Sequence, residues 1–227
     1  MALKIITTSD GSHSLLNEEL NETYHSIHGA IQESKHVFIE HGLCYYLQNK
    51  SPEKLSILEI GFGTGLNAYL TVNVVSQQKV MVTYTTLEAF PLEKEIWSTL
   101  NYAETELQKE IFSALHEGKW EIEIPIHSNL VMRKLHVTLQ QVELPTNEFD
   151  LVYFDAFAPS KQPELWTFTT LQKVTNAMKP GGVFVTYCAK GQLKRDLKAL
   201  GCTVESLPGP PGKMEMVRAT KLALPGA

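Results

Sequence analysis

The stretch LEIGFGTGLN, residues Leu58–Asn67, decides the fold of this chain. An apolar run precedes it, three alternating glycines form its middle, and a helical pattern begins at its end. Glycine adopts backbone angles that other residues resist and lets the backbone approach a ligand closely. A helix that follows such a turn directs its N-terminal amides at whatever lies there. The stretch therefore predicts strand, tight turn and helix with a ligand at the turn, the plainer interpretation being a tight turn alone.

The spacing of the glycines and one nearby acid indicate the kind of ligand. A dinucleotide fingerprint reads G-x-G-x-x-G and holds a pyrophosphate on the helix amides. Here the spacing is G-x-G-x-G, and Glu59 lies two residues before the first glycine. A carboxylate suits a ligand with an ammonium group and repels a pyrophosphate. These features predict S-adenosylmethionine as the cofactor, with an NAD-type dinucleotide as the alternative.

A second acidic residue supports a nucleoside ligand. After the helix, the apolar run Val80–Leu87 ends at Glu88, more than 20 residues past the glycines. A carboxylate at the end of the second strand of such a unit accepts hydrogen bonds from ribose hydroxyls. Alone, Glu88 also fits a solvated carboxylate at the end of a strand. Together with the glycine loop, it favours a nucleoside site.

The composition is that of an ordinary globular protein. The chain has 227 residues, of which 43% are hydrophobic and 20% charged, enough for one large α/β domain. No apolar run approaches the roughly 20 residues that span a bilayer, so we expect no membrane partner. The three cysteines lack C-x-x-C spacing, which indicates reduced thiols in the cytoplasm. A net charge of −5 argues against a broad phosphate-binding surface but not against a local basic patch.

The rest of the chain alternates between strand and helix patterns from Leu55 onward. Such alternation predicts a mostly parallel sheet with helices on both faces, here seven strands with an antiparallel last strand. The fold class is thus α/β and Rossmann-like, with a small N-terminal extension. We expect residues 1–52 to form that extension, a hairpin and helix on the substrate side, and residues 53–227 to form the main domain. The predicted helices are 66–75, 92–116 (one helix or a pair), 164–178 ended by Lys179–Gly182, and 192–200; the predicted strands are 55–59, 80–88, 130–139, 149–155, 183–187, 203–207 and 214–219.

A second chemical cluster follows the buried run Phe149–Phe154. Asp155 lies at the carboxyl end of this run, where parallel sheets bind ligands. The loop after it holds two prolines, Lys161, Phe157 and Trp166, and aromatic faces suit stacking of a base. Simple packing of the two rings and capping by Asp155 are the structural alternatives.

These motifs together resemble the methyltransferase of the bacterial MnmC/MnmD family, which acts on the aminomethyl group of the wobble uridine in certain transfer RNAs. The similarity rests on the glycine stretch, on EAFPL at residues 88–92 and on FDAFAPSKQPELWT at residues 154–167. The segments at residues 10–13, 24–39 and 209–216 resemble the stand-alone form. Fused relatives carry a flavin-dependent oxidase domain; since this chain ends at Ala227, we expect it to lack that activity.

The resemblance implies a class I S-adenosylmethionine-dependent methyltransferase fold, a function and a set of residues. It implies methyl transfer to the amine of 5-aminomethyl(-2-thio)uridine at position 34 of tRNA, bound by its anticodon loop, and a functional link to a separate oxidase and to the machinery that installs the aminomethyl group. Family members usually have an acid on the adenine side; here Thr138 takes that position. Asp155 is the predicted catalytic residue, which orients the amine and helps to take its proton. Predicted cofactor-binding residues are Glu59, Gly61, Phe62, Gly63, Gly65, Asn67, Glu88, Ala89, Thr138 and Asp155, and predicted substrate-binding residues are Phe157, Lys161, Trp166 and Lys213.

Two further groups of residues have weaker interpretations. Basic residues gather on the predicted helix 192–200 and near it, which suggests contact with anticodon-stem phosphates or a solvated helix face; they are Lys190, Lys194, Arg195, Lys198, Lys213 and Arg218. The histidines 25, 28, 36 and 41 lack a metal-binding framework, so we expect packing and no metal. Methylation of a small-molecule or protein amine and a non-catalytic scaffold remain alternatives to a tRNA enzyme.

Overall fold

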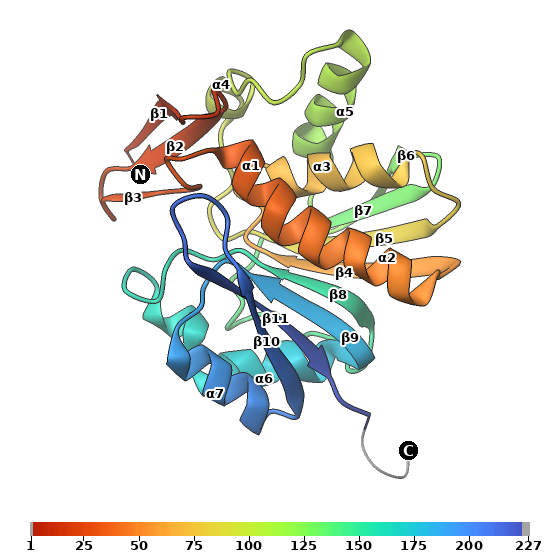
Figure 1. The fold of residues 1–227 in the computed structure, drawn as a ribbon. Helices are drawn as coiled ribbons and strands as arrows, with labels where there is room; N and C mark the ends of the chain where they lie inside the picture. The colour runs from red at the N-terminus through yellow and green to blue at the C-terminus, as the bar shows by residue number, and fades with distance from the viewer. Residues whose placement is uncertain (1, 224–227) are drawn as a thin grey trace.

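The computed structural model describes residues 2–223, and its centre is an eight-stranded sheet (Figure 1). The order across the sheet is β10-β11-β9-β8-β4-β5-β7-β6. Neighbours from β9 to β7 pair in parallel, whereas β11 is antiparallel to both of its neighbours. The predicted mostly parallel sheet with an antiparallel last strand is therefore confirmed. The strand bounds are β4 Lys54–Ile60, β5 Met81–Leu87, β6 Glu123–His127, β7 Leu130–Leu135, β8 Phe149–Phe154, β9 Met178–Thr186, β10 Cys202–Pro208 and β11 Glu215–Lys221.

The eighth strand is β6, which we did not predict. It is an edge strand of this sheet, pairs antiparallel with β7 and has a register shift between Pro125 and His127. The sequence does not predict β6 because its side chains do not alternate clearly between buried and exposed positions, and because a proline in the middle of a segment argues against a strand. Since β6 only extends the edge, the seven expected strands keep their arrangement.

Helices cover both faces of the sheet because successive strand residues point to opposite sides. On one face, Ile57 and Tyr153 pack under α3 (Leu66–Val75), α5 (Glu106–Glu117) and a long helix made of α1 (Ala30–Ser34), η1 (Lys35–Cys44) and α2 (Tyr45–Lys50). On the other face, Leu58 and Val152 pack under α6 (Phe168–Ala177) and α7 (Gly191–Ala199). Figure 1 shows these two layers on either side of the strands.

Of the two longest predicted helices, the first takes the second of its two predicted forms and the other needs correction. The segment 92–116 is a pair, the short α4 (Lys94–Trp97) and α5, which begins at a capping box formed by Thr105 and Gln108. The segment 164–178 is interrupted: η2 (Pro163–Trp166) precedes α6, whose N-cap is Thr167. The predicted stop Lys179–Gly182 was wrong, because α6 already ends at Ala177 and these residues lie within β9.

The N-terminal segment forms a small sheet next to the long helix. β1 (Leu3–Thr7), β2 (His13–Asn17) and β3 (Glu22–Thr23) pair antiparallel, and the predicted Asp10-Gly11 turn joins the first two. The expected helix of this extension begins at Ala30, and η1 then contacts β8, β9 and α3. Residues 30–50 thus help to cover the main sheet, while residues 17–27 reach toward the carboxyl ends of its strands.

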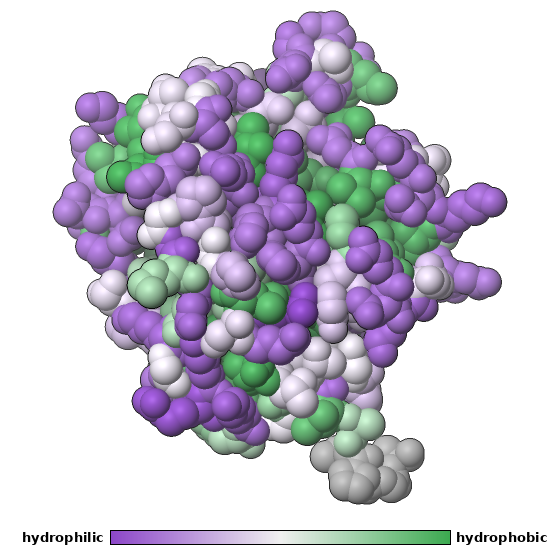
Figure 2. Space-filling model, in the orientation of Figure 1, coloured by the Kyte–Doolittle hydropathy of each residue, from purple (hydrophilic) through white to green (hydrophobic). Residues whose placement is uncertain are grey.

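The face of the molecule that Figure 1 presents carries both hydrophilic and hydrophobic residues. Hydrophobic residues form separate patches among hydrophilic ones in Figure 2. Among the helices of residues 2–223, none has the length and apolar character that a membrane span requires.

Candidate functional site

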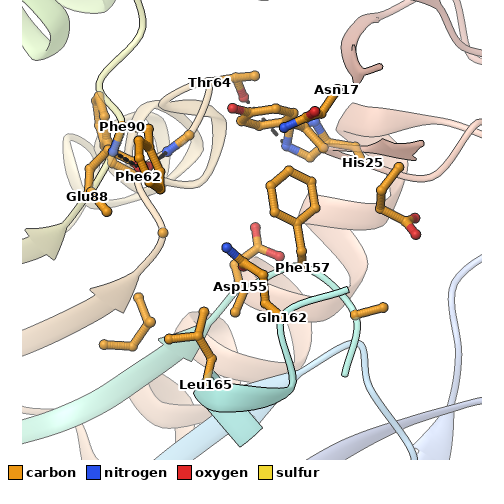
Figure 3. Close-up of a pocket in the computed structure, with 18 of the residues that line it drawn as sticks. Asn17, His25, Phe62, Thr64, Glu88, Phe90, Asp155, Phe157, Gln162 and Leu165 are labelled. Atoms are coloured by element: carbon orange, nitrogen blue, oxygen red, sulfur yellow. Dashed lines mark hydrogen bonds between the residues drawn. The ribbon is translucent and has the colours of Figure 1, made fainter. Parts of the chain in front are cut away.

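A cavity of about 550 Å³ opens where the order of the strands reverses, beyond the carboxyl ends of β4, β5 and β8. Ligands of α/β proteins bind at such a switch point, in cavities of about this size. Figure 3 shows its two sides, with Glu88 and Phe62 facing Asp155 and Phe157 across the opening. The N-terminal segment, from Asn17 to Ile27, completes the wall.

The glycine loop lies between β4 and α3, as predicted, and is held tightly against β8. Gly61 has φ +91°, and a Cβ on it would lie 2.6 Å from the carbonyl oxygen of Asp155. A side chain at this position would therefore be strained and would collide with backbone. The backbone of β8 and the loop can approach each other only because residue 61 is glycine.

Glu88 fixes the same loop from β5. One of its carboxylate oxygens accepts a hydrogen bond of 2.8 Å from the Gly63 N–H, and the other accepts one of 2.8 Å from the Phe90 N–H (Figure 3). Each carboxylate oxygen has a second lone pair that remains for a ligand. Its place on the cavity wall fits the predicted ribose contact.

Glu59 does not lie on the cavity wall. Its side chain is fully buried behind the loop and accepts a hydrogen bond of 2.7 Å from the Thr86 hydroxyl. Burial raises the pKa of Glu59 to about 8, and hydrogen bonding by Thr86 only partly offsets this. The expected direct contact between a Glu59 carboxylate and a ligand ammonium is therefore absent from this arrangement. Oε1 of Glu59 and Oδ1 of Asn67 are both buried without a hydrogen-bond partner within residues 2–223.

Asp155 lies at the end of β8, with its carboxyl group in the cavity. Its Oδ2 accepts a hydrogen bond of 2.8 Å from Nδ2 of Asn67, the second residue of α3. Burial raises the pKa of Asp155 to about 7, and the nearby Glu33 carboxylate adds to this effect. An acid with a pKa near neutrality is suited to exchange a proton with a substrate.

Lys213 enters the cavity from the loop between β10 and β11. Its ammonium group pairs with Glu33, which is only 5% exposed and also accepts a hydrogen bond of 2.7 Å from the Ser26 N–H. The same ammonium lies 3.7 Å from the centroid of the Tyr187 ring, a cation–π distance. Lys213 therefore faces inward, away from the surface on which we expected a phosphate contact.

The charge of the cavity is negative. Within residues 2–223, five carboxylates line it against one Lys or Arg side chain, Lys213. Burial lowers the pKa of the lining His25 to about 4, so this ring adds no positive charge at neutral pH. Such a cavity favours a cationic ligand without phosphate. The lining acids are Glu22, Glu33, Glu88, Asp155 and Glu164.

Most of the predicted site residues meet in this one cavity. Thr138 also lies on the wall, although its hydroxyl donates a hydrogen bond of 2.8 Å to Gln141. Phe157 lies edge-on to the Tyr24 ring, 5.0 Å between centroids. The predicted residues on the wall are Gly61, Phe62, Gly63, Asn67, Glu88, Ala89, Thr138, Asp155, Phe157 and Lys213.

Lys161, Trp166 and Gly65 lie outside the wall. The Lys161 ammonium donates to the carbonyl oxygens of Leu20 and Asn21, at 2.8 and 3.2 Å, and so ties the β8–η2 loop to the N-terminal segment. Trp166 is 8% exposed and donates 2.8 Å to the Phe157 carbonyl, so its ring is not open for stacking on a base. Its predicted substrate contact is replaced by support of Phe157.

The basic helix residues are partly engaged elsewhere. Lys194 pairs with Glu215, and Arg195 donates to Gln192 on its own helix. Arg218 is 8% exposed and pairs with Glu205. The arrangement favours the interpretation of a largely structural cluster over that of a continuous phosphate-binding surface.

Sequence reasoning missed many of the residues that line the cavity, among them Tyr187, Tyr24 and Glu33. Tyr187 is the last residue of the predicted strand 183–187 and directly follows β9, so the rule on carboxyl ends of strands would have identified it. Tyr24 and Glu33 lie in the segment 24–39 that resembles the stand-alone form, but neither belongs to a motif whose chemistry marks it as a site residue. Their place in the site follows only from the packing of the N-terminal segment over the glycine loop.

Comparisons with known proteins show the family and the fold of this chain. The sequence family described as S-adenosyl-L-methionine-dependent methyltransferase matches residues 99–222. The tRNA 5-methylaminomethyl-2-thiouridine biosynthesis bifunctional protein MnmC of Leptospira borgpetersenii is 29% identical over 212 residues, 89% of this chain and 32% of that protein. The protein of the same name from Actinobacillus pleuropneumoniae is 27% identical, over 93% of this chain and 34% of its own length. This chain thus spans about a third of the curated relatives that it matches.

A solved structure extends the similarity to the whole fold. The crystal structure of MnmC2 from Aquifex aeolicus superposes with a TM-score of 0.80 at 27% identity, over 99% of this chain and 72% of that one. The N-terminal segment is included in this overlap, since so little of the chain is left out. The family match covers more than half of the sequence and excludes the alternative of an NAD-type dinucleotide-binding protein. The chain belongs to the family of S-adenosyl-L-methionine-dependent methyltransferases.

Proposed function

We propose that this methyltransferase transfers a methyl group from S-adenosylmethionine to the amine of 5-aminomethyl(-2-thio)uridine at wobble position 34 of bacterial tRNA, giving the 5-methylaminomethyl derivative. The observation that supports this choice of substrate is the similarity of nearly the whole chain, N-terminal segment included, to the Aquifex MnmC2 structure. The names of the curated relatives support it, although they are about three times longer. Action on tRNA would place the protein in the cytoplasm, and the resemblance still suggests a link to a separate oxidase and to the aminomethyl-installing machinery.

The cavity fits S-adenosylmethionine by its chemistry. Gly61 and Gly63 bring bare backbone to the wall, and the unpartnered Asn67 Oδ1 is a buried acceptor beside it. We assign the ribose hydroxyls to Glu88 and the adenine side to Ala89 and Thr138. The bound cofactor supplies a methyl group already activated by a positively charged sulfur.

Asp155 is the residue that we assign to the substrate amine. An amine attacks through its free lone pair, so it must arrive neutral and well oriented. An alkyl amine such as lysine has a reference pKa of about 10.4 and is mostly protonated at neutral pH. The Asp155 carboxylate accepts a hydrogen bond from the amine, holds it in position and takes up its proton. Asn67 keeps the carboxylate in place during this exchange.

The N-terminal segment supplies the remaining contacts. Tyr24 and Phe157 form an aromatic pair on the wall, where an unpaired anticodon base can pack. Lys161 ties the loop that carries Phe157 to the N-terminal segment through its hydrogen bonds to the carbonyl oxygens of Leu20 and Asn21. Lys190 and Arg195 remain candidates for phosphate contacts at the rim, with Lys194 already paired.

The test is mass spectrometry of wobble nucleosides. The purified protein is incubated with isotopically labelled methyl donor and with tRNA from a strain that lacks the methyltransferase. The expected product is labelled 5-methylaminomethyl(-2-thio)uridine, and Asp155→Asn serves as the matched inactive control. Label on free amines or on protein, with none at position 34, would instead establish the small-molecule or protein-amine alternative.

A further inference from the structure

The last turn of α5 lies directly beneath the glycine loop. His116 places Nε2 3.1 Å from the Thr64 carbonyl oxygen, in the middle of the loop. A Cβ on Gly65 would lie 2.8 Å from the same nitrogen, so the ring fills the space that this glycine leaves open. The Phe62 ring also packs on His116, 5.1 Å between centroids. His116 thus contacts three residues of the loop from an element that does not line the cavity.

The direction of this hydrogen bond fixes the protonation of the ring. A carbonyl oxygen only accepts hydrogen bonds, so Nε2 must carry the proton. Burial lowers the pKa of His116 to about 3; the hydrogen bond to Thr64 opposes this and the nearby Lys134 ammonium adds to it, and the ring is left neutral. The ring plane is set by stacking on Trp97, at 4.7 Å between centroids and an angle of 9°. The imidazole is therefore a fixed, neutral donor.

Lys134 in β7 holds the end of α5 in turn. Its side chain is fully buried, and its ammonium donates a hydrogen bond of 2.6 Å to the carbonyl of His116. The ammonium lies 4.7 Å from the centroid of the Trp120 ring and 5.6 Å from that of Phe62. A cation at the C-terminus of a helix is favourable because the helix carbonyls point toward it. β7 and α5 together form a support for the loop.

The geometry points to His116 as a positioning residue for the cofactor, which holds the glycine loop in its binding conformation through the hydrogen bond to Thr64. A loop that is ordered before the ligand arrives loses less conformational freedom on binding. This role concerns cofactor affinity alone. It would stand even if the methyl acceptor proved different from the one proposed.

The test compares His116→Phe with His116→Gln. Phenylalanine keeps an aromatic ring but cannot donate, and we expect S-adenosylhomocysteine to bind about fivefold more weakly by calorimetry. Amide hydrogen exchange of residues 61–65 in the ligand-free protein should rise by a similar factor. Glutamine keeps a donor at a similar reach, so its Kd should stay within about twofold of the original value.

Phe112→Leu is the matched control. Phe112 lies one turn earlier on α5 and packs against Trp97, Tyr102 and the His116 ring itself, but has no donor to offer the loop, so its replacement alters the packing around His116 and keeps the hydrogen bond. It should lower the unfolding temperature and leave the Kd unchanged. The inference is overturned if Phe112→Leu weakens binding as much as His116→Phe, or if His116→Phe binds with the original affinity.

A spectroscopic measurement keeps the inference testable if His116→Gln does not fold. Nitrogen NMR of the unsubstituted protein should show His116 as the neutral Nε2–H tautomer from pH 5.5 to 8.5. A charged ring or an Nδ1–H tautomer in that range would exclude the hydrogen bond to Thr64 and with it the proposed role.

Discussion

Asp155→Asn should make the ligand-free protein more stable at alkaline pH while it removes activity. The fold raises the pKa of Asp155 from its ordinary value of 3.8 to about 7, chiefly because the carboxyl group is buried. The folded protein therefore disfavours the charged carboxylate. Asparagine has nearly the same shape, carries no charge and can still accept the hydrogen bond from Asn67.

The size of the effect follows from the shift in pKa. Between pH 3.8 and 7, folded Asp155 keeps a proton that the unfolded chain has released, so stability falls as pH rises through this window. A shift of about 3 units corresponds to at most about 4 kcal/mol at 1.36 kcal/mol per unit. The advantage of Asp155→Asn should thus grow from near zero at pH 4 toward this limit at pH 8. Loss of the Asp155 charge should also stabilise the folded protein through Glu59. Burial raises the pKa of Glu59, and the Asp155 carboxylate raises it further, so this second contribution disappears in the variant.

Urea unfolding at pH 4.5, 6, 7 and 8, without cofactor, measures this difference. Equal slopes of free energy against urea for both proteins would show that the folded state is unchanged. The same variant should lose about a hundredfold or more in methyl transfer, the usual range for general acid–base residues. A stability difference that does not vary with pH, or a less stable variant at pH 8, would refute the reasoning.

Three further substitutions test other parts of the site. Gly61→Ala forces φ +91° on alanine and places its Cβ 2.6 Å from the Asp155 carbonyl, so we expect a loss of about 2 kcal/mol or more in thermal unfolding; an unchanged unfolding temperature would contradict this. Glu88→Gln keeps the shape but removes the charge and one acceptor, and should weaken S-adenosylmethionine binding about tenfold by calorimetry, whereas equal affinity would show that the carboxylate does not face the cofactor. Lys161→Met breaks the tie to Leu20 and should raise the KM for tRNA about threefold with the cofactor Kd unchanged; a KM equal to that of the original protein would remove Lys161 from the substrate side.

The parts of the site that were predictable are those encoded by local pattern. The glycine loop, Glu88 and Asp155 each follow a recognisable strand, and parallel strands bring their carboxyl ends to one edge. Glu59 shows the limit of this rule. It too ends a strand, but the alternation of the strand turns its side chain behind the loop. Because neighbouring residues of a strand point to opposite faces, a difference of one position decides whether a side chain lines the cavity or is buried behind it.

Local pattern also misjudged exposure. Trp166 lies in a loop motif and looks available for stacking, yet Phe154 and Tyr187 enclose it. Lys134 belongs to the predicted strand 130–139 and its charge suggests exposure, yet it is fully buried among aromatic rings. Neither outcome is visible in sequence, because burial depends on which neighbours the fold brings in.

Sequence alone determined the sheet, its ligand-binding edge and the cofactor class, since periodicity and glycine spacing act over a few residues. Tertiary structure alone decided the second half of the cavity. Glu33 and Lys213 are 180 residues apart and meet beside Tyr187 because the N-terminal segment and the β10–β11 loop fold over the same edge. Their pairing depends on close packing of distant segments, for which a single chain of letters carries no periodic signal.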